Sequence, residues 1–148
     1  MPAHVHAVKG YSTLMQLQPY LFFYGRCEEA LEFYKKTLGG TYELMRVGDT
    51  PMADQFPADQ RDKVMHASFT ADAVSFLCAD GRETKAVDPE AGNMSLALTA
   101  TDAAEGDRVF RALSDGGTVK MPLEAAFWGG RFGMFVDRFG NDWMMTTP

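Results

Sequence analysis

The chain has little cysteine, no long hydrophobic run and no basic excess, and each shortage excludes a class of protein. Its 148 residues contain two cysteines, Cys27 and Cys78, which form no ligand motif. Two thiols in a chain without a secretory signal suggest a reducing cytosol. Neither the first ten residues, MPAHVHAVKG, nor any later stretch has the apolar run of a signal peptide or a membrane helix. We therefore expect a cytoplasmic protein with no membrane-spanning segment.

The charge balance excludes a second group of partners. The formal net charge is −6 at pH 7, and no basic stripe is interleaved with aromatic residues. An acidic chain repels the phosphate backbone of nucleic acids and the anionic surface of a membrane. We therefore expect neither a nucleic-acid partner nor a membrane partner.

What the chain does have is the composition and length of one globular domain. Hydrophobic residues make up 46% of it and charged residues 23%. The length suits one domain, or two small repeats that share a core. Residues 1–15 lack clear periodicity and are expected to form an N-terminal arm or an edge strand. His4 and His6 in this arm could chelate a stray metal, but nothing fixes their geometry.

The first half of the chain reads as a strand, a helix and three strands. Residues 17–24 are apolar throughout, as in a strand that is buried on both faces. In residues 27–40, apolar side chains recur every three or four positions, which predicts an amphipathic helix that ends at Gly39 or Gly40. The remaining predicted elements are strands at 41–47, 64–70 and 73–79, a polar surface loop at 48–63 and a tight turn near Asp72.

The second half begins after a polar, turn-rich linker at residues 80–92. A predicted strand at 93–100 precedes a predicted helix at 101–117. Thr101 or Asp102 is expected to be the N-cap of this helix, with Glu105 completing a capping box from Asp102.

Three more strands complete the second half. Pro122 interrupts the first, residues 118–128, which is therefore expected to be an edge strand or to contain a bulge. Gly129-Gly130 is predicted to form a two-residue hairpin turn, because both glycines can adopt positive φ. The last two predicted strands are 131–137 and 142–147, and Asp137 and Asp142 are expected to be turn residues between them.

The two halves therefore repeat one order of elements. Phe33 precedes Gly39-Gly40 by the same interval as Phe110 precedes Gly116-Gly117. A repeat of this kind indicates a duplication. We predict an α+β fold in one domain, residues 1–148, whose βαβββ modules at 17–79 and 92–147 form a curved mixed sheet around a cavity.

Three stretches carry a resemblance to a known family: PYLFFYGRCEEALEFYKKTLGG, MHASF and FWGGRFGMFVDRFGNDWMM. Together with the βαβββ repeat, they resemble the vicinal oxygen chelate superfamily, which includes glyoxalase I, bleomycin-resistance proteins and extradiol dioxygenases. The closer resemblance is to its PhnB-like branch, often labelled demethylubiquinone methyltransferase-like. It covers residues 17–147 and implies a homodimer with a cupped small-molecule cavity.

Enzymes of this superfamily hold a divalent metal with His, Glu or Gln from the first and last strands of each module. The resemblance places these positions at Gln18 or Pro19, within 75–78, at Ser95 or Met94, and at Met144. Most of these residues offer a divalent metal little, and Gln18 with Cys78 would form only half a site. We therefore expect no metal and no other cofactor.

Five residues are candidates for ligand binding: His66, Ser95, Trp128, Arg131 and Met144. His66 could act as a general base or as a core histidine. Arg131 could bind a carboxylate or phosphonate, pair with Asp137 or Glu124, or cross a dimer interface. Trp128 could form a ligand wall or an interface, and Met144 could line the cavity or fill the core. One or both of Tyr20 and Tyr24 are expected to face the helices, with a cavity hydroxyl as the alternative.

The leading functional hypothesis is a metal-free small-molecule binder that sequesters or senses its ligand, in the style of bleomycin-resistance proteins. One alternative is a metal-dependent lyase, isomerase or dioxygenase of the glyoxalase type. Another is a metal-free acid–base enzyme that uses His66. No G-x-S-x-G nucleophile motif is present, and no G-x-G-x-x-G follows a strand, so the residues give the methyltransferase label no support.

Overall fold

The structure is a computed structural model, and it describes residues 15–81 and 92–148. The N-terminal arm with His4 and His6, and most of the expected linker, lie outside the described residues. The first module consists of β1 (Tyr20–Phe22), α1 (Cys27–Leu38), β2 (Thr41–Arg46), β3 (Val64–Ala71) and β4 (Val74–Ala79). The second consists of β5 (Leu96–Thr99), α2 (Ala103–Ser114), β6 (Thr118–Ala125), β7 (Arg131–Val136) and β8 (Asp142–Thr147). No described helix is long and apolar enough to cross a membrane.

Each module builds its own mixed sheet, and the two sheets have the same topology. The strand orders are β1-β4-β3-β2 and β5-β8-β7-β6. β1 runs parallel to β4, and β5 runs parallel to β8, whereas the other neighbours are antiparallel. The predicted α+β class and its two βαβββ modules are confirmed, with two four-stranded sheets.

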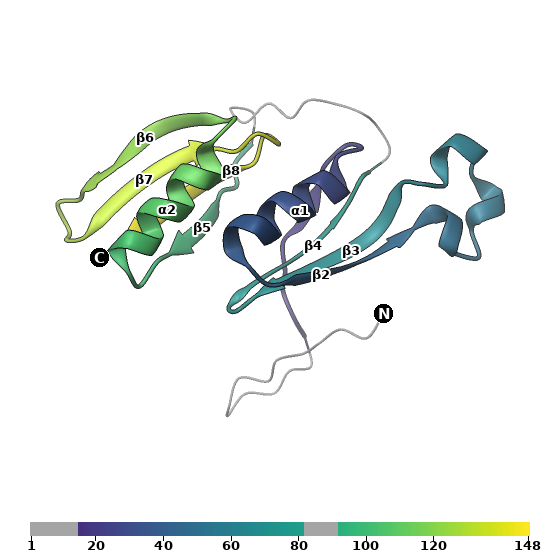
Figure 1. The fold of residues 1–148 in the computed structure, drawn as a ribbon, viewed down its shortest axis with the longest axis horizontal. Helices are drawn as coiled ribbons and strands as arrows, with labels where there is room; N and C mark the ends of the chain where they lie inside the picture. Colours follow the sequence, from purple (N-terminus) through teal and green to yellow (C-terminus); the bar gives the residue numbers. More distant parts are fainter. Residues whose placement is uncertain (1–14, 82–91) are drawn as a thin grey trace.

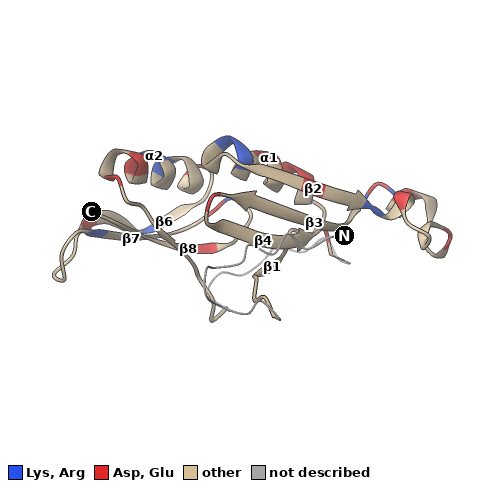
Figure 2. Ribbon diagram, turned by 90° about the horizontal axis from the view of Figure 1, so that it is seen from below, with Lys and Arg blue, Asp and Glu red and all other residues tan. Residues whose placement is uncertain are grey.

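The helices lie on one side of the molecule and the sheets on the other (Figures 1 and 2). α1 covers one face of the first sheet, α2 covers one face of the second, and the two helices pack beside each other. Each sheet therefore has one face turned away from the helices, which we call its open face. Figure 2 also shows that charged residues gather on the helices and on the loop beyond β2, whereas β3 and β4 carry none.

A single aromatic core lies between the helices and the sheets. Tyr34 of α1 is fully buried and contacts aromatic rings from both modules, among them Phe69, Phe76 and Trp143. Trp143 in turn stacks on Phe135, with ring centroids 6.1 Å apart. The core is therefore continuous across the two modules.

A buried carboxylate joins the modules at this core. Asp137, only 2% exposed, accepts hydrogen bonds from the Tyr34 hydroxyl at 2.5 Å and from Trp143 Nε1 at 2.8 Å. The backbone N–H groups of Phe139 and Asn141 donate to its other oxygen. Asp137 begins the predicted turn, since its carbonyl oxygen accepts a hydrogen bond from the Gly140 N–H. Tyr34 adds a partner that the sequence spacing could not reveal.

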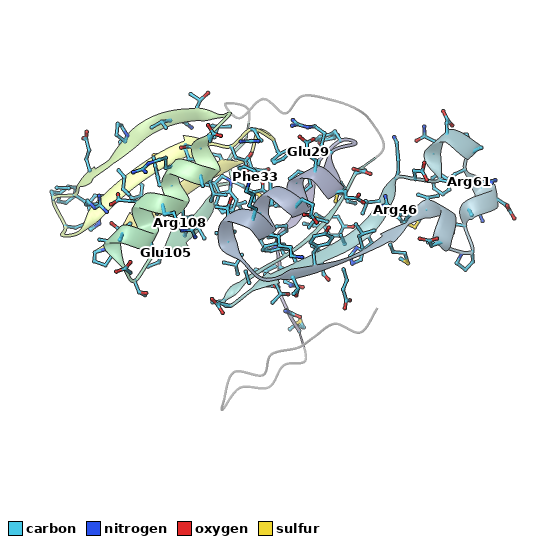
Figure 3. All side chains as sticks on the ribbon, viewed as in Figure 1. Glu29, Phe33, Arg46, Arg61, Glu105 and Arg108 are labelled. Atoms are coloured by element: carbon cyan, nitrogen blue, oxygen red, sulfur yellow. The ribbon has the colours of Figure 1, made fainter. Side chains whose placement is uncertain are left out.

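Polar contacts between the helices reinforce this junction. Phe33 of α1 and Arg108 of α2 lie near the facing sides of the two helices (Figure 3). Arg108 donates to the carbonyl oxygen of Thr37 at 2.8 Å, and the Arg138 guanidinium lies 4.2 Å from the centre of the Phe33 ring. Such cation–π contacts are worth about 0.5–1 kcal/mol at exposed sites.

The helix ends follow the sequence closely. α1 ends before Gly39 and Gly40, whose φ values are 76° and 83°. Asp102 is the N-cap of α2 and accepts a hydrogen bond from the Glu105 N–H. The Glu105 carboxylate pairs with Arg108, so the predicted capping box is only half formed.

Two local predictions need correction. The first strand spans three residues, because Tyr24 and Gly25 adopt positive φ and turn the chain into α1. The turn at Gly129-Gly130 has the predicted positive φ values, but Ala125 pairs with Arg131, so residues 126–130 form a longer connection. β6 is an edge strand with irregular register around Met121, as Pro122 predicted.

Candidate functional site

The open face of the first sheet carries the polar candidates. Side chains alternate along a strand, so Ala67, Phe69 and Ala71 are buried toward α1 while His66 lies on the opposite face. Tyr20 lies on this same face of β1, because its hydroxyl reaches His66 across β4.

Tyr20 and His66 form a hydrogen-bonded pair. The Tyr20 hydroxyl oxygen lies 2.9 Å from His66 Nδ1, and the ring centroids are 5.6 Å apart. Partial burial, and to a lesser degree the nearby thiols of Cys78 and Cys27, raise the pKa of Tyr20 above its usual value. Tyr20 therefore supplies an open-face hydroxyl, which is the alternative to facing the helices. The aromatic-rich sequence gave no alternation from which to read its direction.

The direction of the Tyr20–His66 hydrogen bond determines what the imidazole can offer. If the phenol donates to Nδ1, the neutral imidazole carries its proton on Nε2 and can donate to a ligand oxygen. If Nδ1–H donates to the phenol, Nε2 keeps its lone pair and can accept a proton. The pair can thus serve in polar recognition or in proton transfer.

Gln18 and Cys78 do not form a partial metal site. The Gln18 amide donates to the hydroxyl of Ser75. Cys78 is fully buried on the helix side of β4, where its Sγ lies 3.6 Å from Cys27 Sγ. Ser75 and Cys78 are three residues apart on one strand, so they point to opposite faces. The hydrogen bond to Cys78, together with burial, raises the pKa of the Cys27 thiol and keeps it protonated.

A pocket of about 520 Å³ adjoins the Tyr20–His66 pair. We call it the first-sheet pocket. Strand residues line one side of it, and the connection between β2 and β3 lines the other. Tyr20 belongs both to the pocket and to the pair with His66. Its lining residues are Tyr20, Phe22, Val47, Met52, Phe56, Gln60, Lys63, Val64, Met65, Ala79 and Gly81.

The β2–β3 connection forms the outer wall of this pocket because it folds on itself. Residues 47–60 contain three short 3₁₀ turns, η1 (Val47–Asp49), η2 (Ala53–Gln55) and η3 (Ala58–Gln60). Val47 N–H donates to the carbonyl of Lys63 at 2.9 Å, and Gly48 N–H donates to that of Arg61 at 2.8 Å. Figure 3 shows Arg61 within this connection and Arg46 at its start. These bonds close the connection at its base and preorganise the wall.

Sequence reasoning missed this wall. The stretch 48–63 reads as a polar surface loop, and most of its residues are indeed polar or turn-forming. The available signal was weak: Met52 and Phe56 are isolated apolar residues within it. A loop that folds over a sheet face needs such apolar side chains to cover that face.

The open face of the second sheet carries Ser95 and Met144. The Ser95 hydroxyl donates to Asp142, and Lys120 Nζ lies 3.2 Å from the other Asp142 oxygen. Asp142 begins β8 and is therefore not a turn residue. Met144 alternates with the buried residues Trp143 and Met145, which places it on the open face.

Ser95 of the second module shares a hollow with residues of the first module. It lines a hollow of about 280 Å³ between the sheets, together with Pro19 and Ser75. The hollow brings together three positions that the superfamily resemblance had marked. Their side chains offer two hydroxyl groups, which are weak ligands for a borderline metal such as zinc, and a proline ring, which has no ligand atom. Within residues 15–81 and 92–148, no group of three His, Cys, Asp or Glu side chains is placed to hold a metal ion.

Arg131 lies at the start of β7 and contacts α2. Its Nη1 lies 2.8 Å from Asp107 Oδ1, and its Nη2 donates to the carbonyl of Ala103 at 3.3 Å. Its partner is thus Asp107, rather than Asp137 or Glu124.

Trp128 lies at the tip of the β6–β7 connection. It is 57% exposed, and its ring contacts those of Phe127 and Phe132. Together with Met121 these residues line a shallow hollow of about 330 Å³. The structure therefore separates Trp128 and Arg131 from the Tyr20–His66 pair, which lies on the other sheet.

Two mixed βαβββ sheets with helices on one side form a glyoxalase-like fold, which solved structures of lower identity share. A family model described as 3-demethylubiquinone-9 3-methyltransferase matches residues 15–146. The chain belongs to this family, the PhnB-like branch that the three sequence stretches indicated.

Relatives cover nearly the whole chain. Protein YjdN of Escherichia coli is 30% identical over 90% of this chain and 95% of its own length. The crystal structure of protein PA1353 from Pseudomonas aeruginosa is 39% identical, with a TM-score of 0.77 over 90% of this chain and 97% of that chain. A putative 3-demethylubiquinone-9 3-methyltransferase, PhnB protein, from Bacillus cereus is 26% identical, with a TM-score of 0.71 over 90% of this chain and all of that chain.

Proposed function

We propose that this protein binds a small, largely apolar molecule in the first-sheet pocket without a metal, and that it sequesters or senses this molecule. The observation that carries the proposal is the pocket of about 520 Å³ itself. Its volume lies within the range of about 300–1,000 Å³ that small-molecule sites occupy.

The chemistry of the pocket wall supports a binding role. Phe22, Met52 and Phe56 contribute large apolar surfaces, and methionine adapts to ligands of different shape. Tyr20 adds a hydroxyl group whose partner His66 orients it. A mainly apolar wall with a few placed polar groups is the usual composition of a ligand site.

The test uses the neutral fluorescent probe N-phenyl-1-naphthylamine, whose emission rises in an apolar site. We expect one probe molecule to bind per chain, and Phe56→Ala to weaken its binding about fivefold or more, because truncating an aromatic ring of the pocket wall removes a large contact area. The matched control is Phe127→Ala, since Phe127 is 98% exposed and lies in the corresponding connection of the second module. Equal effects of the two substitutions would refute binding in the first-sheet pocket.

Elemental analysis of the purified protein tests the metal-free part of the proposal. We expect substoichiometric amounts of zinc, iron, nickel and manganese. One equivalent of any of these metals, retained through dialysis against a chelator, would instead favour the lyase, isomerase or dioxygenase alternative.

A second candidate function, acid–base catalysis, is favoured by the hydrogen bond between Tyr20 and His66. When His66 Nδ1–H donates to the Tyr20 hydroxyl, Nε2 keeps its lone pair and can accept a proton from a substrate. For any substrate that is turned over, His66→Ala should abolish turnover, and Tyr20→Phe should shift the pH profile of kcat. Unchanged turnover in folded His66→Ala would assign the histidine a structural role.

We also propose a cytoplasmic homodimer. Met121, Phe127 and Trp128 are exposed and line one hollow of the second module, and clustered exposure of this kind marks association surfaces. Light scattering coupled to gel filtration should give twice the chain mass. A monomer at micromolar concentration would refute this assembly.

A further inference from the structure

The first-sheet pocket has one charged residue among its described lining residues, Lys63. The neighbouring polar residue is Gln60, which comes from the same turn, because Lys63 N–H donates to the Gln60 carbonyl at 3.2 Å. The polar groups that the β2–β3 connection contributes therefore come from one short segment beside an otherwise apolar wall.

The acidic groups close to Lys63 in the chain or in the fold have other partners. Asp80 directs its carboxylate toward the N–H groups of Cys27 and Val64. Asp54 pairs with Arg61 at 3.7 Å, and Asp62 contributes to the raised pKa of Arg46. The partners of these carboxylates are backbone N–H groups and arginines, so a ligand anion would meet Lys63 without displacing them.

We infer that the ligand of the first-sheet pocket is a monoanion with an apolar, preferably aromatic, body, and that Lys63 binds its carboxylate or sulfonate group. This inference rests on the proposed binding function of that pocket. A neutral apolar ligand would cover the Lys63 ammonium group without replacing its lost water, which is unfavourable. A polyphosphate would need more than one cation, and Lys63 is the only one that the described lining supplies.

The preference for an anionic ligand is a local property of the pocket, because the protein as a whole is acidic. The chain carries a net charge of −6, so the protein as a whole repels anions. Preference for an anionic ligand must therefore come from Lys63, with Gln60 as an additional hydrogen-bond donor. Salt should weaken this preference, because the pocket is open to solvent.

Two probes with the same aromatic framework test the inference. 8-Anilinonaphthalene-1-sulfonate carries one sulfonate, and N-phenyl-1-naphthylamine is its neutral counterpart. In fluorescence titrations of the full chain, Lys63→Met should weaken binding of the anionic probe about five- to tenfold and leave the Kd of the neutral probe within about twofold. Lys63→Arg, which keeps the charge, should retain most of the affinity for the anion.

The outcomes separate this inference from the proposed function. Equal weakening of both probes by Lys63→Met, or no weakening of the anionic probe, would overturn the inference, while the pocket would remain a binding site if Phe56→Ala still impaired the neutral probe. If Phe56→Ala affected neither probe, the proposed function itself would fail. Phe127→Ala controls for binding of either probe to the exposed aromatic residues of the β6–β7 connection. The unfolding midpoint of each variant verifies that it folds.

Discussion

The two modules have the same topology and differ most in one connection. In the first module the connection between the second and third strands spans residues 47–63 and folds into three 3₁₀ turns. In the second module the corresponding connection spans residues 126–130. The long connection covers one end of its sheet and forms a pocket of about 520 Å³, whereas the short one leaves Phe127 and Trp128 exposed.

This difference separates scaffold from site. The elements that repeat, one helix on four strands, supply the core and the helix junction. The element that does not repeat supplies Met52, Phe56 and Lys63, which line the pocket. The proposed binding function therefore depends on a connection carried by a repeated scaffold, as is common for binding sites.

The modules also use a buried aspartate differently. Asp80 accepts two hydrogen bonds from backbone groups of its own module. Asp137 accepts four, one of them from Tyr34 in the other module. Asp137 thus stabilises the association of the modules as well as a local turn.

The largest expected effect comes from removing this junction. Asp137→Ala leaves four buried donors without their acceptor and should lower the free energy of unfolding by about 3–5 kcal/mol. Asp80→Ala strands two donors and should cost about 2–3 kcal/mol. Urea unfolding measures both, with Asp115→Ala as an exposed control. If Asp80→Ala proved the more damaging substitution, Asp137 would not be the principal link.

The glycine pairs that follow each helix should give the next largest effect. A Cβ on Gly40 would overlap the carbonyl of Thr70, and its φ of 83° adds strain, so Gly40→Ala should cost about 3 kcal/mol. Gly117→Ala would overlap the carbonyl of Val136 without the strained φ and should cost about 2 kcal/mol.

Gly39 is the control for this series, because a Cβ there meets nothing within 4 Å. Its φ of 76° alone should make Gly39→Ala cost about 1 kcal/mol. Thermal or urea unfolding should rank the three variants in this order. Equal losses for Gly39 and Gly40 would indicate that close packing against β3 is unimportant.

The smallest expected effect is a loss of folding stability at alkaline pH, and it comes from the Tyr34 hydroxyl. Burial, and then Asp137, raise the pKa of Tyr34 well above its usual value. The contribution of the protonated Tyr34 hydroxyl to the free energy of unfolding is fully present below about pH 10, where the tyrosine of the unfolded chain is also protonated. Above this pH the unfolded chain loses the proton first, so stability should fall by up to about 1.4 kcal/mol per pH unit.

Tyr34→Phe should be less stable than the wild type at pH 8 but should lose less stability between pH 8 and 11.5, so that the two curves converge. The control is Tyr42→Phe. A hydrogen bond to Glu32 raises the pKa of Tyr42 to about 12, but the group is exposed and solvent screens its effect. Parallel curves for Tyr34→Phe and the wild type would contradict the proposed linkage.

Much of this architecture was predictable because it depends on local chemistry. Glycine pairs ended α1 and preceded β6, Asp102 capped α2, and Pro122 marked an edge strand. Each of these features acts within a few residues along the chain, through backbone conformation and unpaired N–H or C=O groups. The repeat of elements then followed from periodicity, and the family resemblance from three quoted sequence stretches.

The site depended on contacts that no local pattern encodes. Only the folded chain brings Tyr34 to Asp137, Tyr20 to His66 and residues 47–63 over the first sheet. These partners are far apart in sequence, and the faces that they occupy depend on strand register, where a shift of one residue reverses every side chain. The sequence by itself thus determined the elements and their order, whereas the tertiary structure decided which polar groups meet and where the pocket forms.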